Sequence, residues 1–403
     1  MRLERVDAGD ARAVLRGLRG AVLGAGPAIA LDAAGVASAV ADPGAAALPA
    51  ALPHEVPPGT AVLVTTSGST GYPKSVVLSR SALTASALAT AARLGEGAWL
   101  LALPPGYIAG VQVLVRALVS GHEPALLSGA FSAGAFAAAA SAMASSVGGN
   151  RIPAFTSLVP SQLQTVLDDP DAAGALGRFE AVLVGGQALP PPLAERAVAA
   201  GARIVRTYGS SETAGGCVYD GTPLAGVGVR IVAGEVQLSG PTLADGYLDG
   251  DGRVVAAPRG DDPGHASDAA FTRDADGTRW YRTGDAGSFD GVLRVTGRLD
   301  NVIVSGGVNI SLDRVERVVR ALPGLEGAVV VPASSTRWGQ ASVVVVPRSA
   351  AVAGALLDRI RAAVAAELGA PARPAALHVI DAIPHTASGK PDRAALRARF
   401  GGD

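Results

Sequence analysis

The sequence predicts an α/β protein with a large N-terminal part and a small C-terminal part, and three changes of pattern along the chain support this. Over residues 61–206, short aliphatic runs alternate with helical patterns, which is typical of βαβ units around parallel sheets. After residue 221, short strands and turns follow one another, which predicts a small, antiparallel, barrel-like β region. Mixed elements resume at residue 301, so we expect a separate α+β domain there.

The N-terminal part opens with a helical pattern over residues 10–23. The Ala/Pro/Gly-rich stretch over residues 33–58 predicts an irregular connection with room for a short helix. Beyond it, aliphatic runs that indicate strands alternate with patterns that indicate helices. The strands are expected at residues 61–64, 99–103, 125–127, 181–184 and 203–206, and the helices near residues 111–119, 136–144, 161–167 and 193–200.

The later elements are shorter. In the β region, strands are expected at residues 229–231, 235–238, 280–282 and 292–295. The Gly/Asp/Ala-rich stretch over residues 249–276 shows little periodicity, and we expect a mobile surface loop there with no assigned function. The final part predicts strands at residues 301–304, 328–331, 341–346 and 377–380, and helices after the cap Ser311, over residues 356–368 and after Pro391.

Composition excludes several classes of protein. With 403 residues the chain can form two or more domains, and 49% hydrophobic but only 4% aromatic residues predict an aliphatic core. The formal net charge of −1 gives no support to nucleic acid binding. The first residues lack a leader-like apolar segment and no later run reaches about eighteen apolar residues, so we expect a cytoplasmic protein without membrane insertion.

Cysteine and histidine usage argues against two kinds of chemistry. Cys217 is the only cysteine, which excludes an internal disulfide and a thiolate metal cluster. Nothing near it in sequence would acidify its thiol, so we do not expect a nucleophile. The five histidines show no HxxH or HExxH spacing, so we expect no catalytic zinc.

Residues 65–74 read Thr-Thr-Ser-Gly-Ser-Thr-Gly-Tyr-Pro-Lys and predict a phosphate-binding loop. The glycines let backbone amides turn inward, hydroxyls lie beside them, and Lys74 supplies an ammonium at the exit. The pattern is not a Walker motif, because the GxxxxGK[ST] spacing is missing and β-branched residues follow. The alternative is an ordinary Ser/Thr/Gly turn in a hairpin. The candidate residues are Thr66, Ser67, Gly68, Ser69, Thr70, Gly71 and Lys74.

Lysine is scarce in this chain. Lys74 and Lys390 are its only lysines, and every other basic side chain among the 34 lysines and arginines is arginine. A lysine ammonium can reach into a phosphate cluster as a compact point charge, which a planar guanidinium cannot do. The two lysines are therefore candidates for function, although the excess of arginine is also explained by a compositional habit.

A polar segment, Tyr-Gly-Ser-Ser-Glu-Thr at residues 208–213, follows the strand predicted at residues 203–206. We expect it at the carboxyl end of a parallel sheet, where ligands bind in open α/β folds. Glu212 could hold a divalent metal that bridges phosphates, or it could be a surface carboxylate that caps a helix. Gly185 and Gly186 end another predicted strand, where they would let a flat base approach the backbone or form a plain tight turn.

Three further residues are candidates for nucleotide contacts and domain movement. Asp285 ends the segment Tyr-Arg-Thr-Gly-Asp, where its carboxylate could bind ribose hydroxyls or serve as an ordinary turn residue. Arg298 could meet a phosphate at the join between the β region and the final domain, and Asp300 is positioned as a hinge. Lys390 ends a Gly/Ser loop before the last helix; a solvated lysine is the ordinary interpretation, which the scarcity of lysine weakens.

In this order along the chain, residues 65–74, 208–213, 281–285, 297–300 and 388–390 resemble the signature motifs of the adenylate-forming superfamily. This superfamily includes acyl-CoA synthetases, peptide-synthetase adenylation domains and luciferases. The resemblance runs over most of the chain after residue 61. It implies an N-terminal ATP- and acid-binding domain over residues 1–299 and a small mobile C-terminal domain over residues 300–403, which rotates about Asp300 between two half-reactions.

Within the superfamily the first motif usually lies further along the chain. The shortened start resembles bacterial o-succinylbenzoate–CoA ligases of menaquinone biosynthesis, especially the actinobacterial type, and residues 103–116, 156–163 and 183–186 are similar to them as well. Gly106 and Tyr107 depart from the pattern, because a histidine is expected before the Ile-Ala-Gly stretch. This departure concerns the acyl pocket.

The resemblance implies an acid–CoA ligase with ATP and CoA as substrates and Mg²⁺ as cofactor. In the first step a carboxylate attacks the α-phosphate of ATP, and Lys390 would stabilise the developing charge. Lys74, the loop and Mg²⁺ on Glu212 would hold the pyrophosphate. The other implied nucleotide contacts are Tyr208 stacked on adenine, Gly185, Gly186 and Gly209 in the nucleotide site, Asp285 on the ribose, and Thr213 and Arg298 near the α-phosphate.

The resemblance also implies an acyl pocket and a second step. Rotation about Asp300 would withdraw Lys390, and the CoA thiolate would then displace AMP. Ser305, Gly306 and Gly307 would approach the acyl-adenylate in that orientation. The candidate acyl residues, each with an alternative interpretation as a packing residue, are Tyr107, Gln112, Ser157, Ser210 and Gly216.

Three functions stay open at this point. The first is o-succinylbenzoate–CoA ligation, and the second is ligation of another aryl or acyl acid, including an adenylation enzyme that loads a carrier protein, although no carrier domain follows in this chain. The third is a non-catalytic nucleotide-binding protein, against which Lys74 and Lys390 argue. The expected partners are a small carboxylic acid, ATP and CoA, without nucleic acid; the sequence leaves homo-oligomerisation open.

Overall fold

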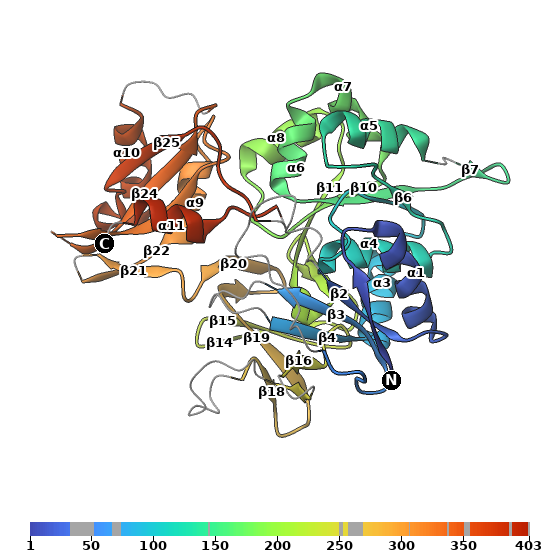
Figure 1. Cartoon of the computed structure of the whole chain (residues 1–403). Helices are drawn as coiled ribbons and strands as arrows, with labels where there is room; N and C mark the ends of the chain where they lie inside the picture. Colours follow the sequence, from blue (N-terminus) through green and yellow to red (C-terminus); the bar gives the residue numbers. More distant parts are fainter. Residues whose placement is uncertain are drawn as a thin grey trace.

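The computed structural model describes residues 1–32, 52–66, 74–143, 146–249, 253–256, 269–305, 307–336, 338–349, 355–386 and 389–401. They form a large N-terminal domain and a small C-terminal domain, the latter drawn in orange and red in Figure 1. The predicted fold class is confirmed. The exact boundary at residues 299 and 300 stays a prediction.

The first sheet of the N-terminal domain has the order β1-β2-β3-β4-β16-β17. Its first three strands are parallel, and β3 and β4 form an antiparallel hairpin in which Thr66 lies opposite Lys74. The central strands β3 and β4 are buried, because side chains pack against both faces of the sheet. The strands are β1 (Leu3–Asp7), β2 (Ala28–Asp32), β3 (Thr60–Thr66), β4 (Lys74–Ser79), β16 (Gly246–Leu248) and β17 (Val254–Val255).

The second sheet contains the parallel strands that the sequence predicts. Its order is β13-β12-β11-β10-β9-β5-β6, and the strands from β6 to β11 are parallel. β11 continues past the predicted end at residue 206, because its last residues pair antiparallel with β12. The strands are β5 (Ala98–Leu101), β6 (Ala125–Leu126), β9 (Ala154–Leu158), β10 (Ala181–Val184), β11 (Ile204–Ser210), β12 (Gly215–Tyr219) and β13 (Thr222–Pro223).

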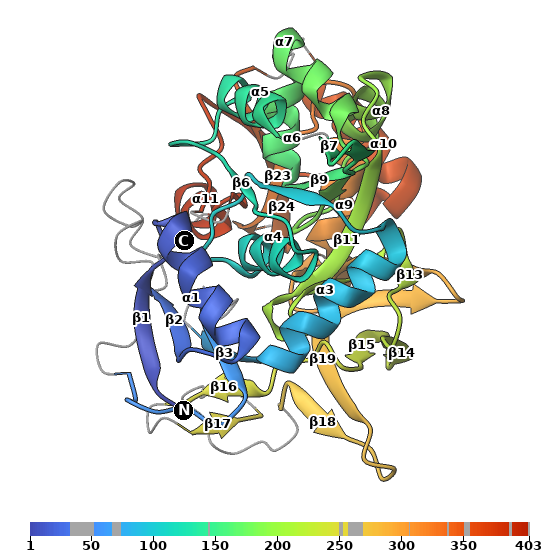
Figure 2. The same cartoon turned by 90° about the vertical axis from the view of Figure 1, so that its right-hand side faces the viewer.

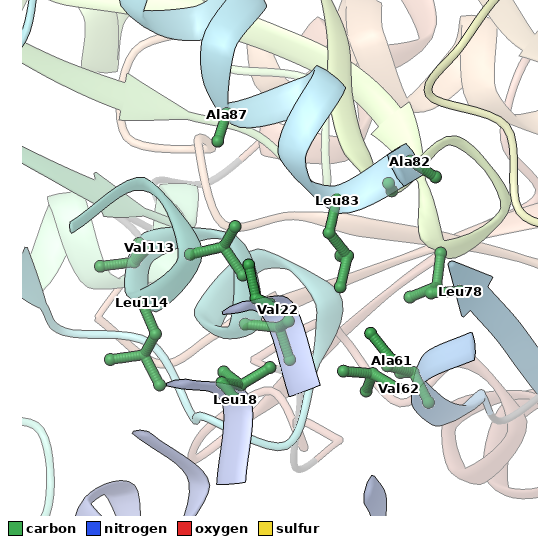
Figure 3. Packing of buried hydrophobic residues seen from close by; sticks show 14 of the residues in the cluster. Leu18, Val22, Ala61, Val62, Leu78, Ala82, Leu83, Ala87, Val113 and Leu114 are labelled. Atoms are coloured by element: carbon green, nitrogen blue, oxygen red, sulfur yellow. The ribbon is translucent and has the colours of Figure 1, made fainter. Parts of the chain in front are cut away.

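Three helices, α1 (Ala11–Leu23), α3 (Arg80–Leu94) and α4 (Ile108–Val119), lie between these two sheets (Figure 2). Figure 3 shows Leu18 of α1, Leu83 of α3, Leu114 of α4 and Val62 of β3 in one shared core. The α1 helix begins at Asp10, whose carboxylate accepts hydrogen bonds from the first turn, as an N-cap residue does. The shared helix layer fixes the two sheets relative to each other.

The outer face of the second sheet is covered by a second group of helices. Phe136, Leu163 and Leu193 from these helices pack against Leu100 and Val182 of the sheet. A short hairpin, β7 (Ser146–Val147) with β8 (Asn150–Arg151), precedes β9. The helices are α5 (Ala133–Ala142), α6 (Pro160–Leu167), α7 (Pro170–Ala173), the 3₁₀ helix η1 (Gly174–Arg178) and α8 (Pro191–Ala199).

The third sheet is antiparallel, as predicted, with the order β14-β15-β19-β18 and with β20 paired to β19. The prediction of a loop over residues 249–276 is wrong in part. Its described residues include β17 and β18, which pair with β16 and β19, so tertiary pairing creates strands that lack periodicity. Residues 250–252 and 257–268 lie outside the described residues. The strands are β14 (Gly228–Val232), β15 (Glu235–Ser239), β18 (Phe271–Arg273), β19 (Arg279–Phe289) and β20 (Leu293–Arg298).

The C-terminal domain combines one sheet with three α-helices among its described residues, and the elements predicted there are confirmed. Ser311 caps α9 through a hydrogen bond from the Arg314 N–H to its hydroxyl. The strand β22 is additional to the prediction. The elements are β21 (Val302–Ser305), β22 (Val308–Ser311), α9 (Leu312–Arg320), β23 (Val329–Ser335), β24 (Gly339–Pro347), α10 (Leu356–Leu368), η4 (Ala370–Ala372), β25 (Ala376–Ile380) and α11 (Arg393–Phe400).

Candidate active site

The carboxyl ends of β10 and β11 form the floor of the candidate site. Gly185 and Gly186 follow β10, and the Gly185 N–H donates to the carbonyl of Leu158 at 3.3 Å. Because β10 and β11 are parallel neighbours, Gly186 and Tyr208 lie at the same edge of the sheet. Gly186 has a φ of +79°, a left-handed conformation that favours glycine. The sheet edge therefore carries two of the predicted nucleotide motifs.

Tyr208 and Asp285 join the second sheet to the third. The hydroxyl of Tyr208 donates to Oδ2 of Asp285 at 2.6 Å. Burial raises the pKa of Asp285, and the hydrogen bond from Tyr208 lowers it. Burial also raises the pKa of Tyr208, and the charge of Asp285 raises it further. Tyr208 is therefore a neutral donor to the carboxylate.

Arg298 lies opposite Asp285 on the neighbouring strand β20. Its Nη1 donates to the carbonyl of Thr283 at 2.8 Å and approaches Oδ1 of Asp285 at 3.4 Å. Nε and Nη2 donate to the two carboxylate oxygens of Asp300, each at 3.0 Å. Hydrogen bonding to Asp300 raises the pKa of Arg298, against the effect of burial. One guanidinium thus links the predicted ribose residue to the predicted hinge.

Glu212 lies in the 3₁₀ turn η2 (Ser211–Thr213) that follows β11. Its Oε1 accepts a hydrogen bond of 2.9 Å from the Tyr247 hydroxyl, and its other oxygen has no hydrogen-bond partner within the described part of the chain. In the same part of the chain, no three His, Cys, Asp or Glu side chains gather to form a protein-only metal site. One oriented carboxylate fits Mg²⁺, which takes few protein ligands when phosphates and water complete its shell.

Lys390 extends from the C-terminal domain to this floor. A β-carbon on Gly186 would lie 3.8 Å from its Cε, so the lysine side chain passes over the end of β10. Burial lowers the pKa of Lys390, while the charges of Asp285 and Glu212 raise it. The side chain keeps contact with solvent. The second of the two lysines thus meets the motifs on the N-terminal domain.

The phosphate loop is described only at its two ends. Thr66 ends β3 and Lys74 begins β4, and the Thr66 hydroxyl donates to the carbonyl of Lys74 at 3.4 Å. The flanking hairpin agrees with both interpretations of this segment, a phosphate loop and an ordinary turn. The other predicted loop residues lie outside the described residues: Ser67, Gly68, Ser69, Thr70 and Gly71.

Thr213 closes the turn that follows β11. Its hydroxyl donates to the carbonyl of Gly215 at 2.7 Å and accepts from the Ser210 N–H at 2.8 Å, and the side chain is fully buried. Gly209, near the end of β11, is exposed. Cys217 on β12 is also buried, and burial raises the pKa of its thiol to about 12. The thiol is therefore protonated, as expected for a residue that is not a nucleophile.

The predicted acyl residues surround α4. Gln112 is buried on α4, where Nε2 donates to the carbonyl of Leu83 at 3.4 Å and Oε1 has no hydrogen-bond partner among the described residues. A β-carbon on Gly215 would lie 3.0 Å from Cγ of Gln112, so this helix borders the turn after β11. The remaining candidates are Tyr107 at the N-cap of α4, Ser157 buried on β9, Ser210 at the end of β11, and Gly216 on β12, which packs against Thr207 of β11.

Comparison with known protein families shows which family the chain belongs to. Residues 18–248 match the family described as AMP-binding enzyme, and residues 314–390 match the AMP-binding enzyme C-terminal domain. The first match covers more than half of the chain. The chain belongs to the AMP-binding enzyme family.

This AMP-binding enzyme is similar to individual named proteins in sequence and to solved structures in fold. It is 40% identical over 356 residues to the probable 2-succinylbenzoate–CoA ligase of Mycobacterium tuberculosis (strain ATCC 25618 / H37Rv), with 87% of each protein covered. It is similar to a variant of Escherichia coli MenE with bound OSB-AMS, with 26% identity, a TM-score of 0.67, and 88% of this chain and 71% of that chain covered. The Bacillus subtilis o-succinylbenzoate coenzyme A synthetase in complex with ATP and magnesium ion gives 26% identity, a TM-score of 0.64, and coverage of 84% and 70%.

The sequence analysis missed a buried polar cluster beside the acyl candidates of this AMP-binding enzyme. Arg116 lies one turn after Gln112 on α4, and its Nη2 donates to the Tyr219 hydroxyl at 3.1 Å. Thr90 on α3 is within 2.9 Å of the same hydroxyl. Arg116 Nε and the Ser86 hydroxyl are buried without hydrogen-bond partners among the described residues. Two signals were available: an arginine in a mostly apolar helical run, and its place at the end of residues 103–116, which resemble the ligases.

The residues expected to serve the CoA step lie elsewhere in this structure. Ser305 and Gly307 belong to the β21–β22 hairpin, which extends from the C-terminal domain away from the end of β10 (Figure 1). Gly306 lies outside the described residues. The structure therefore brings Lys390, but not this hairpin, to the candidate site.

No helix in the described ranges of this AMP-binding enzyme combines the length and hydropathy needed to cross a bilayer.

Proposed function

We propose that this AMP-binding enzyme is an ATP-dependent acid–CoA ligase that converts 2-succinylbenzoate, ATP and CoA to 2-succinylbenzoyl-CoA, AMP and pyrophosphate. The observation that carries the proposal is the position of Lys390, a cation from the C-terminal domain over Gly186, near the carboxylates of Asp285 and Glu212. Nucleotide binding alone would not require a cation from a second domain. The relative from Mycobacterium tuberculosis supports the choice of acid and a place in menaquinone biosynthesis.

In the first step the substrate carboxylate attacks the α-phosphate of ATP, forms an acyl-adenylate and releases pyrophosphate. The Lys390 ammonium stabilises the negative charge that develops on the α-phosphate and the bridging oxygen. Asp285 accepts hydrogen bonds from the ribose, with Tyr208 holding its carboxylate and presenting a ring for the adenine. Arg298 steadies Asp285 from the other side and lies near the α-phosphate. Lys74 and the loop before it hold the departing phosphates.

Glu212 is the residue that would hold Mg²⁺. Tyr247 fixes one carboxylate oxygen, and the other has no hydrogen-bond partner among the described residues. The ion would neutralise phosphate charge when bound. Thr213 keeps the turn closed around Glu212, since its hydroxyl bonds to the backbone on both sides.

The choice of acid is also supported by Arg116, a buried cation that has no carboxylate partner among the described residues. Arg116 is buried on α4 beside the acyl candidates, stacked at 5.1 Å over the Trp99 ring, and burial lowers its pKa. A buried cation without a counterion is costly, so a bound anion would offset that cost. 2-Succinylbenzoate has two carboxylates, of which one is activated and the other stays charged. We assign Arg116 and Gln112 to the second carboxylate, and keep Ser157, Ser210, Tyr107 and Gly216 as candidates for contact with the rest of the acid.

In the second step the CoA thiolate displaces AMP from the acyl-adenylate. Rotation about Asp300 would remove Lys390 and bring the hairpin around Ser305 and Gly307 to the site. The bidentate bond between Arg298 and Asp300 must then rearrange, because the two residues flank the rotating segment. Since ATP and CoA are cytoplasmic substrates, the proposed location is the cytoplasm.

The experiment measures pyrophosphate release from ATP and Mg²⁺ with 2-succinylbenzoate, benzoate or a medium-chain fatty acid, for the wild type, Lys390→Ala and Arg116→Met. We expect release with 2-succinylbenzoate, a loss of about 100-fold or more in Lys390→Ala, and a KM for 2-succinylbenzoate raised about tenfold or more in Arg116→Met.

Benzoate serves as the matched substrate control, because it lacks the second carboxylate. Its slow release should be the same in the wild type and in Arg116→Met, which separates loss of an anion site from general damage to the fold. Release only with the fatty acid would support activation of an acid by ATP but contradict 2-succinylbenzoate as the substrate. No release with any acid would overturn the ligase proposal.

A further inference from the structure

The structure assigns to Ser161 and Gln187 a role as positioning residues for Lys390: they hold the carbonyl of Gly389 and so fix the lysine over the nucleotide site. This inference rests on the proposed function, since it concerns the residue that acts in acid activation. Ser161 lies within the similar stretch at residues 156–163, and Gln187 directly follows the one at residues 183–186, but neither side chain is among the predicted site residues. Both belong to the N-terminal domain, whereas Gly389 belongs to the C-terminal domain.

Two elements converge on one carbonyl. The Ser161 hydroxyl, in the first turn of α6, donates to the Gly389 oxygen at 3.3 Å. The Nε2 of Gln187, in the connection from β10 to α8, donates to the same oxygen at 3.3 Å. Figure 1 shows the red connection before α11 extending toward α6 and α8. Because a carbonyl oxygen accepts two hydrogen bonds, these two donors saturate it.

The peptide they hold is part of a tight turn. The Gly389 N–H donates to the carbonyl of Thr386 at 2.8 Å, and the Thr386 N–H donates to the carbonyl of Lys390 at 2.7 Å. Gly389 itself has a φ of +78°, and a β-carbon there would lie 3.1 Å from Cγ2 of Val159. These bonds join Thr386 to Gly389 and Lys390, so holding the Gly389 carbonyl constrains the backbone at the start of the Lys390 side chain.

The position of Lys390 is sensitive to this anchor because its side chain is long. A lysine has four rotatable bonds, so its ammonium reaches one place only when the backbone beneath it is fixed. The carbon before the ammonium lies beside Gly186, one residue before Gln187. The same connection therefore supplies the surface under the lysine side chain and one of the two donors that hold its backbone.

The two donors act in only one half-reaction. Acid activation needs the ammonium beside the α-phosphate, so losing the anchor should slow it. Attack of CoA on a preformed acyl-adenylate does not use Lys390 in the proposed mechanism. Removal of the donors should therefore change the two steps unequally, which a residue with a purely structural role would not do.

The test uses full-length Ser161→Ala, Gln187→Ala and the double variant, with two separate assays. The first assay measures pyrophosphate release with 2-succinylbenzoate, and the second measures 2-succinylbenzoyl-CoA formed from synthetic acyl-adenylate and CoA. We expect a threefold to tenfold loss of kcat in the first assay for each single variant and about 30-fold for the double variant, with the second assay unchanged or faster. Thr165→Ala is the matched control, because this exposed hydroxyl on α6 donates only to the Ser161 carbonyl within the helix.

Gln187→Glu adds a charge-dependent readout. An ionised carboxylate cannot donate to the Gly389 carbonyl and repels it, so this variant should be slower than Gln187→Ala at neutral pH. As the pH falls and the carboxyl becomes protonated, it regains a donor, and its rate relative to Gln187→Ala should rise.

Two results would overturn the inference: first-assay kcat in the double variant equal to that of the wild type, or equal losses in both assays. Failure of the ligase proposal is recognised separately, because wild-type protein would then release no pyrophosphate with 2-succinylbenzoate or form no thioester from the acyl-adenylate. If the wild type releases pyrophosphate only with another acid, both assays are repeated with that acid. The ratio of variant to wild-type rate in each assay then tests the role of Ser161 and Gln187.

Discussion

The hydroxyl of Tyr208 and the carboxylate of Asp285 are 2.6 Å apart, although the two residues lie 77 positions apart on strands of different sheets. We expect Tyr208→Phe to raise the KM for ATP about tenfold, since a hydrogen bond to a charged group is lost while the ring is kept. Asp285→Asn and the double variant complete a thermodynamic cycle. If the free-energy changes of the two single variants simply sum to that of the double variant, the Tyr208 hydroxyl does not act through Asp285.

The same pair predicts a pH effect. Burial raises the pKa of Asp285 above its usual range, so its negative charge is lost on acidification earlier than for an ordinary aspartate. The Tyr208 hydrogen bond lowers this pKa, and its removal should move the acid limb of kcat/KM for ATP to higher pH. An acid limb at the same pH in Tyr208→Phe would contradict this expectation.

The pKa of Lys390 should determine where acid activation declines at high pH. Burial lowers its pKa, so the ammonium is present below this pKa and is lost as the pH rises through it. Acid activation should therefore decline at a lower pH than an ordinary lysine would produce. Lys390→Arg should be slower at neutral pH, because the planar group does not match the space over Gly186, but should lack this basic limb. Measuring pyrophosphate release from pH 7 upward tests both statements, and an unchanged basic limb in Lys390→Arg would remove Lys390 as its cause.

Glu212 should control the dependence on Mg²⁺. Glu212→Gln keeps an oxygen acceptor for Tyr247 but removes the charge, and we expect the Mg²⁺ concentration for half-maximal pyrophosphate release to rise about tenfold or more. Tyr247→Phe keeps the charge and removes only its orientation, so its effect should be smaller. Equal Mg²⁺ titrations for the wild type and Glu212→Gln would show that the ion is held elsewhere.

Glu316 in the C-terminal domain is buried and pairs with two arginines, Arg320 and the partly exposed Arg393. Both oxygens of Glu316 accept hydrogen bonds of 2.8 Å from Arg393, and Oε2 also accepts the Val330 N–H at 2.9 Å. Glu316→Ala should lower the free energy of unfolding of this domain by about 3–5 kcal/mol, because it leaves Arg320 and Arg393 without their carboxylate. Guanidinium unfolding followed by circular dichroism measures this.

Asp381→Ala provides the control for that measurement. It removes an ion pair with Arg348 whose side chains are 89% and 73% exposed, and exposed pairs contribute little to stability. If Asp381→Ala lowers the free energy of unfolding as much as Glu316→Ala does, burial of the ion pair does not explain its contribution to stability.

The sequence predicts β5, β6, β10 and β11 of the parallel sheet, but not the central strand β9. The strand at residues 181–184 is predicted to the residue, since four buried aliphatic side chains leave no other pattern. By contrast, β1 and β2 of the first sheet escape prediction: β1 has only two apolar residues, Leu3 and Val6, in five positions, and β2 is a short, mostly apolar run of five residues. The extension of β11 through Ser210 depends on pairing with β12, which no local pattern shows.

The candidate site shows the same division. Motif residues such as Tyr208, Asp285 and Lys390 could be selected because their side chains suit phosphates and ribose and stand beside strand ends. Arg116 could not, because the burial of its Nε without a hydrogen-bond partner in the described part of the chain is a property of the folded core. Gln187 contacts a residue 202 positions away in the chain, and such contacts leave no trace in a single sequence.

Among the described residues, no apolar cluster contains side chains from both domains. The contacts across the boundary include hydrogen bonds, such as those from Arg317 to the carbonyls of Val295 and Thr296 and from the Arg298 N–H to Asp313. Exposure of apolar surface is what gives conformational changes a large heat capacity. Reorientation of the C-terminal domain should therefore have a heat-capacity change near zero, and its enthalpy should stay constant on warming and cooling.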